Sequence, residues 1–311
     1  MVKCSIIIPT YNRADVLKRC LFSLSENKEI NQAEIILVDD GSNSENIKKI
    51  KKIINSIKLN IKIFYQKNAG PAAARNLAIK KSLGKILMFI NDDTVVENDF
   101  INKHMEFHKK FSKENRAVLG LFIDHPEIKH DQIVDKFLYK SKMHFDYPSP
   151  NGNKYELLPW NYFWTNNISL KKSFLIKNKL NFDTDFATAA WEDVEFGWRA
   201  KNKGLHIYLD RNLVAYHYHR LGFDDLISRF FSHGRGLFVL SRKIDYDALP
   251  PLAKRRYRIL ARILLFLTMS RHLEPIIRKY FKNGGENVFL MHWLVIYQKI
   301  TGFDYQSNYS L

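Results

Sequence analysis

The stretch CSIIIPTYNR, residues 4–13, decides the fold class of this 311-residue chain. Its first five residues form an apolar run that is typical of a strand buried on both faces of a parallel sheet. Pro9 cannot donate a ladder hydrogen bond, so we expect the strand to end there and the chain to turn. The polar residues 10–13 then form either a plain surface loop or one wall of a ligand site.

Strand and helix patterns alternate over the first 95 or so residues. Apolar runs predict further strands at residues 34–38, 61–65 and 85–90. Apolar stripes at helical spacing predict helices at residues 14–25 and 47–57, and residues 72–82 are predicted to form a third helix. Ser42 and Glu45 fit a capping box ahead of the second helix. The alternation indicates an α/β fold with a mostly parallel sheet, in which ligands bind beyond the carboxyl ends of the strands.

Acidic residues follow two more of these strands. Asp39 and Asp40 end the second strand, and Asn91, Asp92 and Asp93 end the fourth. Adjacent carboxylates repel one another unless a cation or hydrogen bonds compensate, and Mg²⁺ and Mn²⁺ prefer oxygen ligands. A carboxylate after the second strand can also accept the ring N–H of a pyrimidine base. The alternative is that these residues cap a turn or a helix.

Three further groups carry candidate chemistry. Arg75, in an alanine-rich stretch, is placed to meet a carboxylate or phosphate, although such a stretch can equally be a tightly packed helix. Asp193, beside Glu192 at the start of a predicted helix, suits a general base, although the helix dipole also favours acids there. His217 and His219, two residues apart on a predicted strand, point the same way and can offer a ring to a metal.

Composition and cysteine usage bear on partners and compartment. The formal charge of +17 and the pI near 9.6 predict attraction to polyanions, or else lysine-rich solvated faces. Cys4 and Cys20 fall in apolar patterns and are predicted to be buried free thiols. The first residues show no signal peptide, and the longest apolar runs, at residues 263–269 and 288–297, are shorter than the ~20 residues that span a bilayer. We therefore expect a cytoplasmic protein.

Taken together and in this order, these stretches resemble the family 2 glycosyltransferases, which have the GT-A fold. The resemblance rests on residues 5–13 (SIIIPTYNR), 38–42 (VDDGS), 68–76 (NAGPAAARN), 91–94 (NDDT), 165–169 (TNNIS), 181–183 (NFD), 192–195 (EDVE) and His217. It covers residues 3 to 220 and is specific as a set. It implies a catalytic domain at residues 1–222, with a nucleotide-binding half (1–95) and an acceptor-binding half (96–222), followed by a basic helical extension at residues 223–311.

The resemblance also implies a role for each matching residue. Thr10, Tyr11 and Arg13 would line the nucleotide pocket, Asp40 and also Asp39 would contact the base, Arg75 would lie beside the nucleotide, and Asp92 would bind the ribose. Asp93 would hold a divalent metal, Mn²⁺ or Mg²⁺, with His217 as a further ligand and His219 as the second choice. Asp193 would be the catalytic base of an inverting transfer, and Glu192 would contact donor or acceptor.

The resemblance implies a nucleotide sugar as donor, with UDP as the expected nucleotide. The implied acceptor is a hydroxyl group of a saccharide or a lipid-linked molecule in glycan or polysaccharide synthesis.

The chain departs from the family pattern in three places. Asn91 stands where many members have a third aspartate, so the metal site is expected to rest on Asp93 and His217. Residues 164–166 replace the Gly-rich approach usual before the Asn-x-Ser segment, so specificity is expected to differ. No Gln-x-x-Arg-Trp motif follows the acidic pair at residues 192–193, which argues against a processive enzyme.

Other classes of protein fit less well. No Gly-x-Gly-x-x-Gly follows the first strand, which argues against a dinucleotide-dependent dehydrogenase. A metal-dependent nucleotidyltransferase is the alternative enzyme, although its expected Gly-rich basic loop is missing. A nucleic-acid-binding protein would leave the paired acids at the strand ends unexplained, so no nucleic-acid partner is expected.

The basic C-terminal region leaves two alternatives. Residues 251–300 contain ten Lys or Arg and two Glu, interleaved with leucine, isoleucine and aromatic residues. Such segments suit peripheral contact with the anionic inner face of the cell membrane. The alternative is a helical subdomain that packs on the catalytic domain or forms a homodimer.

Overall fold

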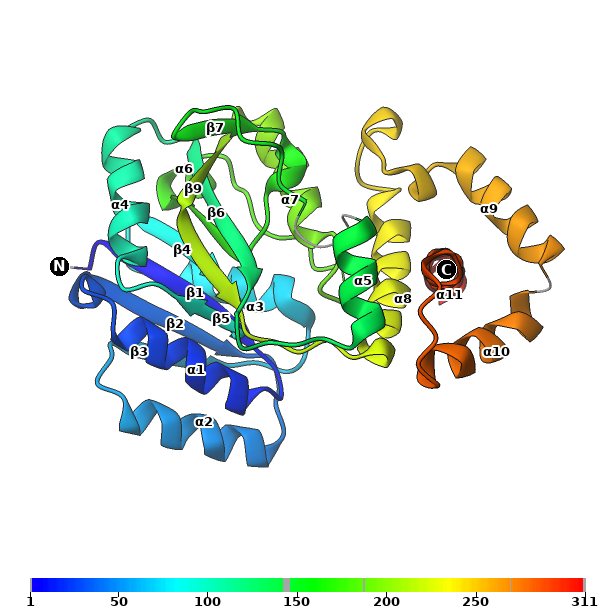
Figure 1. Cartoon of the computed structure of the whole chain (residues 1–311). Coiled ribbons are helices and arrows are strands. Elements are labelled where there is room, and N and C mark those ends of the chain that lie inside the picture. Colours follow the sequence, from blue (N-terminus) through cyan, green and yellow to red (C-terminus); the bar gives the residue numbers. More distant parts are fainter. Residues whose placement is uncertain (1, 142–145, 187, 269, 310–311) are drawn as a thin grey trace. The chain divides into compact units, whose positions relative to one another are not determined.

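The computed structural model describes residues 2–141, 146–186, 188–268 and 270–309 (Figure 1). Their internal contacts divide them into two compact units. The sheet unit lies within Met1–Glu127, Ser149–Ala187 and Glu192–His219, and the helical unit lies within Ile128–Pro148, Thr188–Trp191 and Arg220–Leu311. The helical unit therefore includes two short segments from the middle of the chain. The domain limits expected from the sequence stay a prediction.

The described residues of the sheet unit form one nine-stranded sheet. Its strands are β1 (Cys4–Thr10), β2 (Ala33–Asp39), β3 (Ile61–Tyr65), β4 (Ile86–Ile90), β5 (Thr94–Val96), β6 (Arg116–Asp124), β7 (Tyr155–Leu158), β8 (Asn167–Lys171) and β9 (His206–His217). The order is β3-β2-β1-β4-β8-β6-β9-β5, with β7 paired to β9. The first four strands are parallel, as expected. Beyond β4 the sheet is mixed, because β8 runs antiparallel to both β4 and β6 while β6 and β9 are parallel.

Helices connect the parallel strands at the predicted places. The helices of the sheet unit are α1 (Ala14–Ser25), α2 (Ser44–Ser56), α3 (Gly70–Lys81), α4 (Phe100–Lys110), α6 (Lys172–Lys177) and α7 (Glu192–Asn202). With right-handed crossovers, this strand order places α1 and α2 on one face of the parallel strands and α3 on the other. Cys4 and Cys20 are buried free thiols, as predicted.

The capping box predicted at Ser42 is wrong. The N-cap of α2 is Asn43, whose side chain accepts a hydrogen bond from the amide of Asn46. Ser42 belongs instead to the turn after β2, because its amide donates to Asp39 Oδ1 and its hydroxyl accepts from the amide of Asn12. Ser42 does not cap α2 because its side chain is already hydrogen-bonded within the loops after β1 and β2.

The helical unit packs around two long helices. It contains α5 (Gln132–Ser141), α8 (Phe223–Leu240), α9 (Arg255–Leu267), α10 (Ser270–Lys282) and α11 (Val288–Tyr309). In Figure 1, α11 is seen end-on, with α8 on one side and α9 and α10 on the other. Gly234 and Gly302 let α8 and α11 approach closely, because a Cβ at either position would lie 2.1 or 2.0 Å from a carbonyl oxygen of the other helix. Within the described ranges, no helix is both long enough and apolar enough to cross a bilayer.

Candidate active site

The parallel strands bring their polar ends together at one edge of the sheet. Thr10 ends β1, and Asp92 and Asp93 follow β4, the strand paired with it. Thr10 Oγ1 donates to Asp92 Oδ2 at 2.8 Å. Arg13 donates from Nη1 to Asp92 Oδ1 and from Nη2 to Asp93 Oδ2, both at 2.8 Å. The cationic compensation that adjacent carboxylates need therefore comes from the loop after β1.

The two aspartates differ in their affinity for a proton. Burial raises the pKa of Asp92 to about 7, against the opposing charge of Arg13. Burial also opposes ionisation of Asp93, but the hydrogen bond and charge of His217, together with Arg13, hold the pKa of Asp93 below its usual range. Asp93 is therefore the carboxylate that stays ionised at neutral pH.

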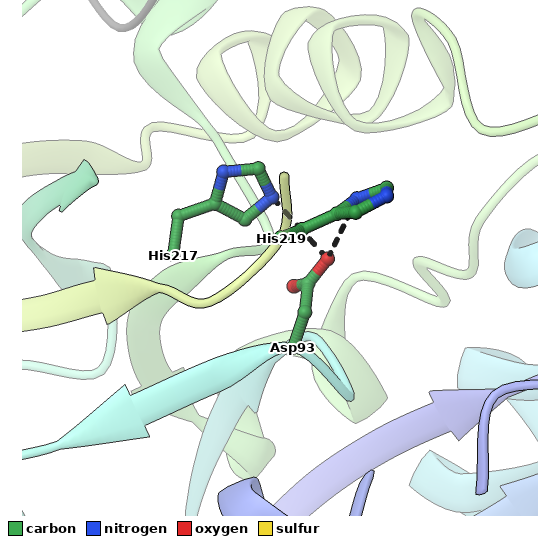
Figure 2. A group of neighbouring side chains, drawn as sticks. All are labelled: Asp93, His217 and His219. Carbon is green, nitrogen blue, oxygen red and sulfur yellow. Dashed lines mark ion pairs between the residues drawn. The ribbon is translucent and has the colours of Figure 1, made fainter. Parts of the chain in front are cut away.

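Two histidines complete a set of potential metal ligands with Asp93 (Figure 2). His217 Nε2 lies 3.3 Å, and His219 Nδ1 3.7 Å, from Asp93 Oδ2, and one ligand atom of each of the three residues lies within 4.8 Å of the others. Asp93 Oδ1 is buried and has no hydrogen-bond partner among the described residues. A buried carboxylate oxygen beside two imidazoles fits a divalent cation that accepts oxygen and nitrogen ligands.

Strand pairing explains why His217 reaches Asp93. The antiparallel β5/β9 ladder pairs Thr94, the residue after Asp93, with His217. The parallel β6/β9 ladder pairs Asp124 with the same histidine, and His217 Nδ1 lies 3.3 Å from Asp124 Oδ1. The sequence reasoning missed Asp124. A local signal was present, because the apolar stretch at residues 117–123 ends in this acid, although nothing in it indicates the pairing with His217.

The acids after β2 hold the backbone of the neighbouring loops. Asp39 Oδ1 accepts from the amides of Gly41 and Ser42, while its buried Oδ2 has no partner among the described residues. Asp40 accepts from the amides of Ala69 and Gly70 at the start of α3, both at 2.9 Å, and its Oδ1 also accepts from a glutamine side chain. Asp40 thus joins the end of β2 to the first turn of α3.

The loop after β1 is fixed against the loop after β2. Asn12 adopts a left-handed backbone conformation, with φ of 54°, and its Oδ1 accepts from the amide of Asn43 at 2.8 Å. Tyr11, the preceding residue, is 47% exposed. The hydrogen bonds of Asn12 already fix this loop. A nucleotide base could therefore stack on the exposed Tyr11 ring without a large loss of loop entropy.

A second group of predicted residues surrounds Asp193 on the first turn of α7. Arg75 Nη1 donates to Glu192 Oε1 at 2.8 Å, and the two side chains form a buried ion pair. Asp193 accepts from the amides of Val194 at 2.8 Å and Thr165 at 3.4 Å. Burial, and then the negative charge of Glu192, raise the pKa of Asp193 to about 7. A carboxylate with this pKa can gain and lose a proton near neutral pH.

The described contacts thus gather the predicted residues into two groups. Thr10, Arg13, Asp92, Asp93, His217 and His219 form one group, and Arg75, Glu192 and Asp193 form the other. Residues 165–166 connect them, because they precede β8, which pairs with the end of β4 through Ile90 and Asn167. Among the residues that the structure describes, no hydrogen bond or ion pair joins the Tyr11 side chain to either group. Asp40 is linked to the first group by its amide, which donates to the Thr10 carbonyl.

The family model described as Glycosyl transferase family 2 matches residues 5–184, more than half of the chain. The chain belongs to this glycosyltransferase family, as the sequence predicted.

Two curated relatives illustrate the match. An uncharacterized glycosyltransferase, YfnE of Bacillus subtilis (strain 168), is 26% identical over 261 residues, covering 70% of this chain and 64% of the relative. The chondroitin synthase of Escherichia coli is 26% identical over 268 residues, covering 78% and 38%. The chain therefore spans less than two thirds of the length of either relative.

Solved structures show the same fold. The mannosyltransferase PcManGT from Pyrobaculum calidifontis, in complex with GDP-Man and Mn²⁺, superposes with a TM-score of 0.62 at 14% identity, covering 99% of this chain and 87% of that one. S. aureus TarS 1-349 in complex with UDP-GlcNAc gives a TM-score of 0.53 at 21% identity, covering 78% and 68%. The GT-A fold predicted from the sequence is confirmed.

Proposed function

We propose that this chain transfers a sugar, with inversion, from a nucleoside-diphosphate donor to a hydroxyl group of a saccharide or lipid-linked acceptor. The observation that carries the proposal is the joining of Thr10, Arg13, Asp92, Asp93 and His217 at the carboxyl ends of the strands. The relative named chondroitin synthase and the fold neighbours solved in complex with UDP-GlcNAc or GDP-Man support a role in glycan or polysaccharide synthesis. UDP is the nucleotide we expect.

The donor nucleotide is proposed to occupy the edge formed by the loops after β1, β2 and β4. Tyr11 offers an exposed ring to the base, and the acids after β2 offer acceptors for its N–H groups. Asp39 carries a buried oxygen without a described partner, whereas Asp40 already accepts from three donors. Base recognition by Asp40 therefore requires a further hydrogen bond to a carboxylate oxygen that is already engaged. Asp92, held by Thr10 and Arg13, is proposed to contact the ribose.

Asp93, His217 and His219 are the residues that would hold Mn²⁺ or Mg²⁺. A divalent ion there would stabilise the negative charge of the departing diphosphate. The low pKa of Asp93 suits this role, because only the ionised carboxylate is a strong ligand. Arg13, which bridges both aspartates, is placed to move toward a phosphate once a cation shares their charge.

Asp124 is proposed to orient His217. A carboxylate that accepts a proton from Nδ1 fixes the tautomer whose Nε2 carries the lone pair, and Nε2 is the atom that faces Asp93. Asp124→Asn is expected to weaken Mn²⁺ binding about tenfold or more, measured by the electron paramagnetic resonance signal of free Mn²⁺. Glu106→Gln, on the exposed surface of α4, is the matched control. Equal Mn²⁺ affinity in Asp124→Asn and the control would show that Asp124 has no such role.

Asp193 is proposed as the general base. Its carboxylate takes the proton of the acceptor hydroxyl while that oxygen forms a bond to the anomeric carbon and the bond from this carbon to the diphosphate oxygen breaks. The sugar is inverted in one step, and the products are the glycosylated acceptor and a nucleoside diphosphate. Arg75 and Glu192 support the base by fixing the first turn of α7.

The decisive experiment measures donor binding and turnover separately. Calorimetry with UDP- and GDP-sugars in the presence of Mn²⁺ or Mg²⁺ is expected to detect one donor class, and turnover to release a nucleoside diphosphate. Release of pyrophosphate would favour a nucleotidyltransferase, and failure to bind any nucleoside diphosphate would refute the proposal. Asp193→Asn is expected to abolish transfer and keep donor binding, with Glu26→Gln on the exposed surface as control. Loss of donor binding in Asp193→Asn would reassign Asp193 to the donor site.

A further inference from the structure

Helix α9 exposes apolar side chains where a surface helix normally carries polar ones. Seven of the 19 exposed large apolar side chains among the described residues lie within its 13 residues. Phe266 is 82%, Leu267 72% and Leu260 63% exposed, and the only buried residue of the helix is Leu265. Single exposed apolar residues are ordinary, but a concentration of this kind marks an interaction surface.

The exposed residues Leu260, Ile263 and Leu267 lie opposite the face that α9 packs into the helical unit. Leu265 belongs to the apolar core of that unit, and Arg258, two turns earlier on the same face, stacks its guanidinium 4.0 Å from the ring centre of Phe303 on α11. Leu260 and Leu267, seven residues apart, share the opposite face. A surface helix normally carries polar residues on the side that faces away from the core. The outward face of α9 is thus built for a partner beyond the core of the helical unit.

Charge identifies the partner. α9 contains four arginines, at positions 255, 256, 258 and 262, and no acidic residue. Arg262 pairs with Asp304 of α11. Arg255 and Arg256 lie exposed at the N-terminal end of α9, where Arg256 is in line with the outward apolar residues. In a two-fold dimer the same patch would meet itself, and α9 offers no acidic side chain with which these arginines could pair. An anionic bilayer offers opposite charge at its surface and an apolar interior beneath it.

We propose that α9 lies in the plane of an anionic lipid membrane, with Leu260, Ile263, Phe266 and Leu267 inserted among the acyl chains and Arg255 and Arg256 at the level of the lipid phosphates. The helix has 13 residues, too few to span a bilayer, but an interfacial helix needs only one apolar side. This proposal does not rest on the proposed sugar transfer, because lipid binding requires no donor.

The test is flotation of the full chain with lipid vesicles. The protein is expected to float with vesicles of phosphatidylcholine containing phosphatidylglycerol, and to float much less with phosphatidylcholine alone or at high salt. Phe266→Ser/Leu267→Ser is expected to lower partitioning at least tenfold. The matched control is Leu83→Ser/Ile176→Ser, which replaces side chains that are 67% and 65% exposed in the sheet unit and should float like the wild type.

A second pair of variants tests the charge. Arg255→Gln/Arg256→Gln is expected to lower partitioning about 30-fold, the combined effect of two basic residues at an anionic surface. Lys51→Gln/Lys52→Gln, which removes two exposed charges from α2, should change it far less. Donor-nucleotide binding should be the same in all four variants, which separates this test from that of the proposed function.

Three outcomes would overturn the proposal. The first is equal flotation of the wild type with neutral and anionic vesicles. The second is a loss of flotation in the α9 variants no greater than in their controls. The third is a wild-type dimer in sedimentation velocity that Phe266→Ser/Leu267→Ser dissociates, together with no vesicle binding, which would assign the apolar face to a second copy.

Discussion

The buried ion pair between Arg75 and Glu192 joins α3 to the first turn of α7, next to Asp193. Both side chains are only 4% exposed, and the atoms that pair lie 2.8 Å apart. Removing one partner would leave the other charge buried without compensation, which costs about 3–5 kcal/mol. Removing both charges together avoids most of that penalty. We therefore expect Arg75→Met to be strongly destabilising and Arg75→Met/Glu192→Gln to be much less so.

The assay is a double-mutant cycle on the full chain. Because the chain has two compact units, unfolding in urea is best followed by amide hydrogen exchange in β1, which reports on the sheet unit alone. The expected loss of about 3–5 kcal/mol for Arg75→Met is a large part of the ~5–15 kcal/mol that stabilises a typical domain. The coupling free energy between the two positions is expected to be about 2–3 kcal/mol.

An exposed ion pair in the same unit provides the control. Lys49 pairs with Asp15 at 3.1 Å, but the side chains are 43% and 83% exposed, so Lys49→Met should leave the stability of the sheet unit close to that of the wild type. A stability of Arg75→Met equal to that of Lys49→Met would contradict a buried ion pair, and so would additive effects of Arg75→Met and Glu192→Gln. A variant Arg75→Met that keeps its stability but loses donor affinity would instead place Arg75 in direct contact with the nucleotide.

Three further predictions follow from single residues. The raised pKa of Asp193 in the free protein is about 7, and the base must be ionised. In a pH–rate profile, kcat/KM should therefore fall with pH below 7, to about one tenth of its plateau at pH 6; a flat profile from pH 6 to 8 would exclude Asp193 as the base. Gly41→Ala should lower the melting temperature more than Gly152→Ala. Both glycines have φ above +80°, but a Cβ at Gly41 would lie 2.7 Å from the amide nitrogen of Asn68, whereas a Cβ at Gly152 would meet no atom within 4 Å. Equal shifts in melting temperature would refute the clash at Gly41. Glu34→Gln should lower the free energy of unfolding by about 1–3 kcal/mol at pH 7. Because folding lowers the pKa of Glu34 from 4.5, its ionised form stabilises the fold above pH 4.5, and this stabilisation is lost as the pH falls below that value. The difference from wild type should therefore shrink below pH 4.5. Urea unfolding at pH 7 and at acidic pH measures this, and a pH-independent difference would contradict it.

The parallel half of the sheet could be predicted because its information is local. Each strand from β1 to β4 is a short apolar run followed by a polar turn, the first two return helices have apolar stripes, and the third is alanine-rich. Residues 10–13 and 91–93 could then be placed together without knowing any contact, because adjacent parallel strands end at the same edge.

The rest of the site depends on pairings that no local pattern encodes. The register that brings Asp124 and His217 together follows the shift in the β6/β9 ladder after Gly120, which sequence spacing does not reveal. Arg75 and Glu192 are 117 residues apart, and each taken alone suits a solvent-facing role. The expectation for Arg75 was a place beside the nucleotide, and its buried acid partner emerges only from the packing of α3 near the first turn of α7.

Strand β8 connects the proposed donor and base functions. It pairs antiparallel with β4, and buried polar side chains fix its position: Ser169 is hydrogen-bonded to His104 and His108, and Asn167 Nδ2 donates to the carbonyl of Leu121. Burial lowers the pKa of both histidines to about 3, so they stay neutral and the network adds no charge beneath the site. A slip of one residue in β8 would turn these polar side chains to the wrong face, so the register is strongly specified. The same register sets the position of the Thr165 amide that holds Asp193. The placement of the proposed base relative to the carboxylates after β4 is therefore a consequence of polar packing under the sheet, outside the site itself.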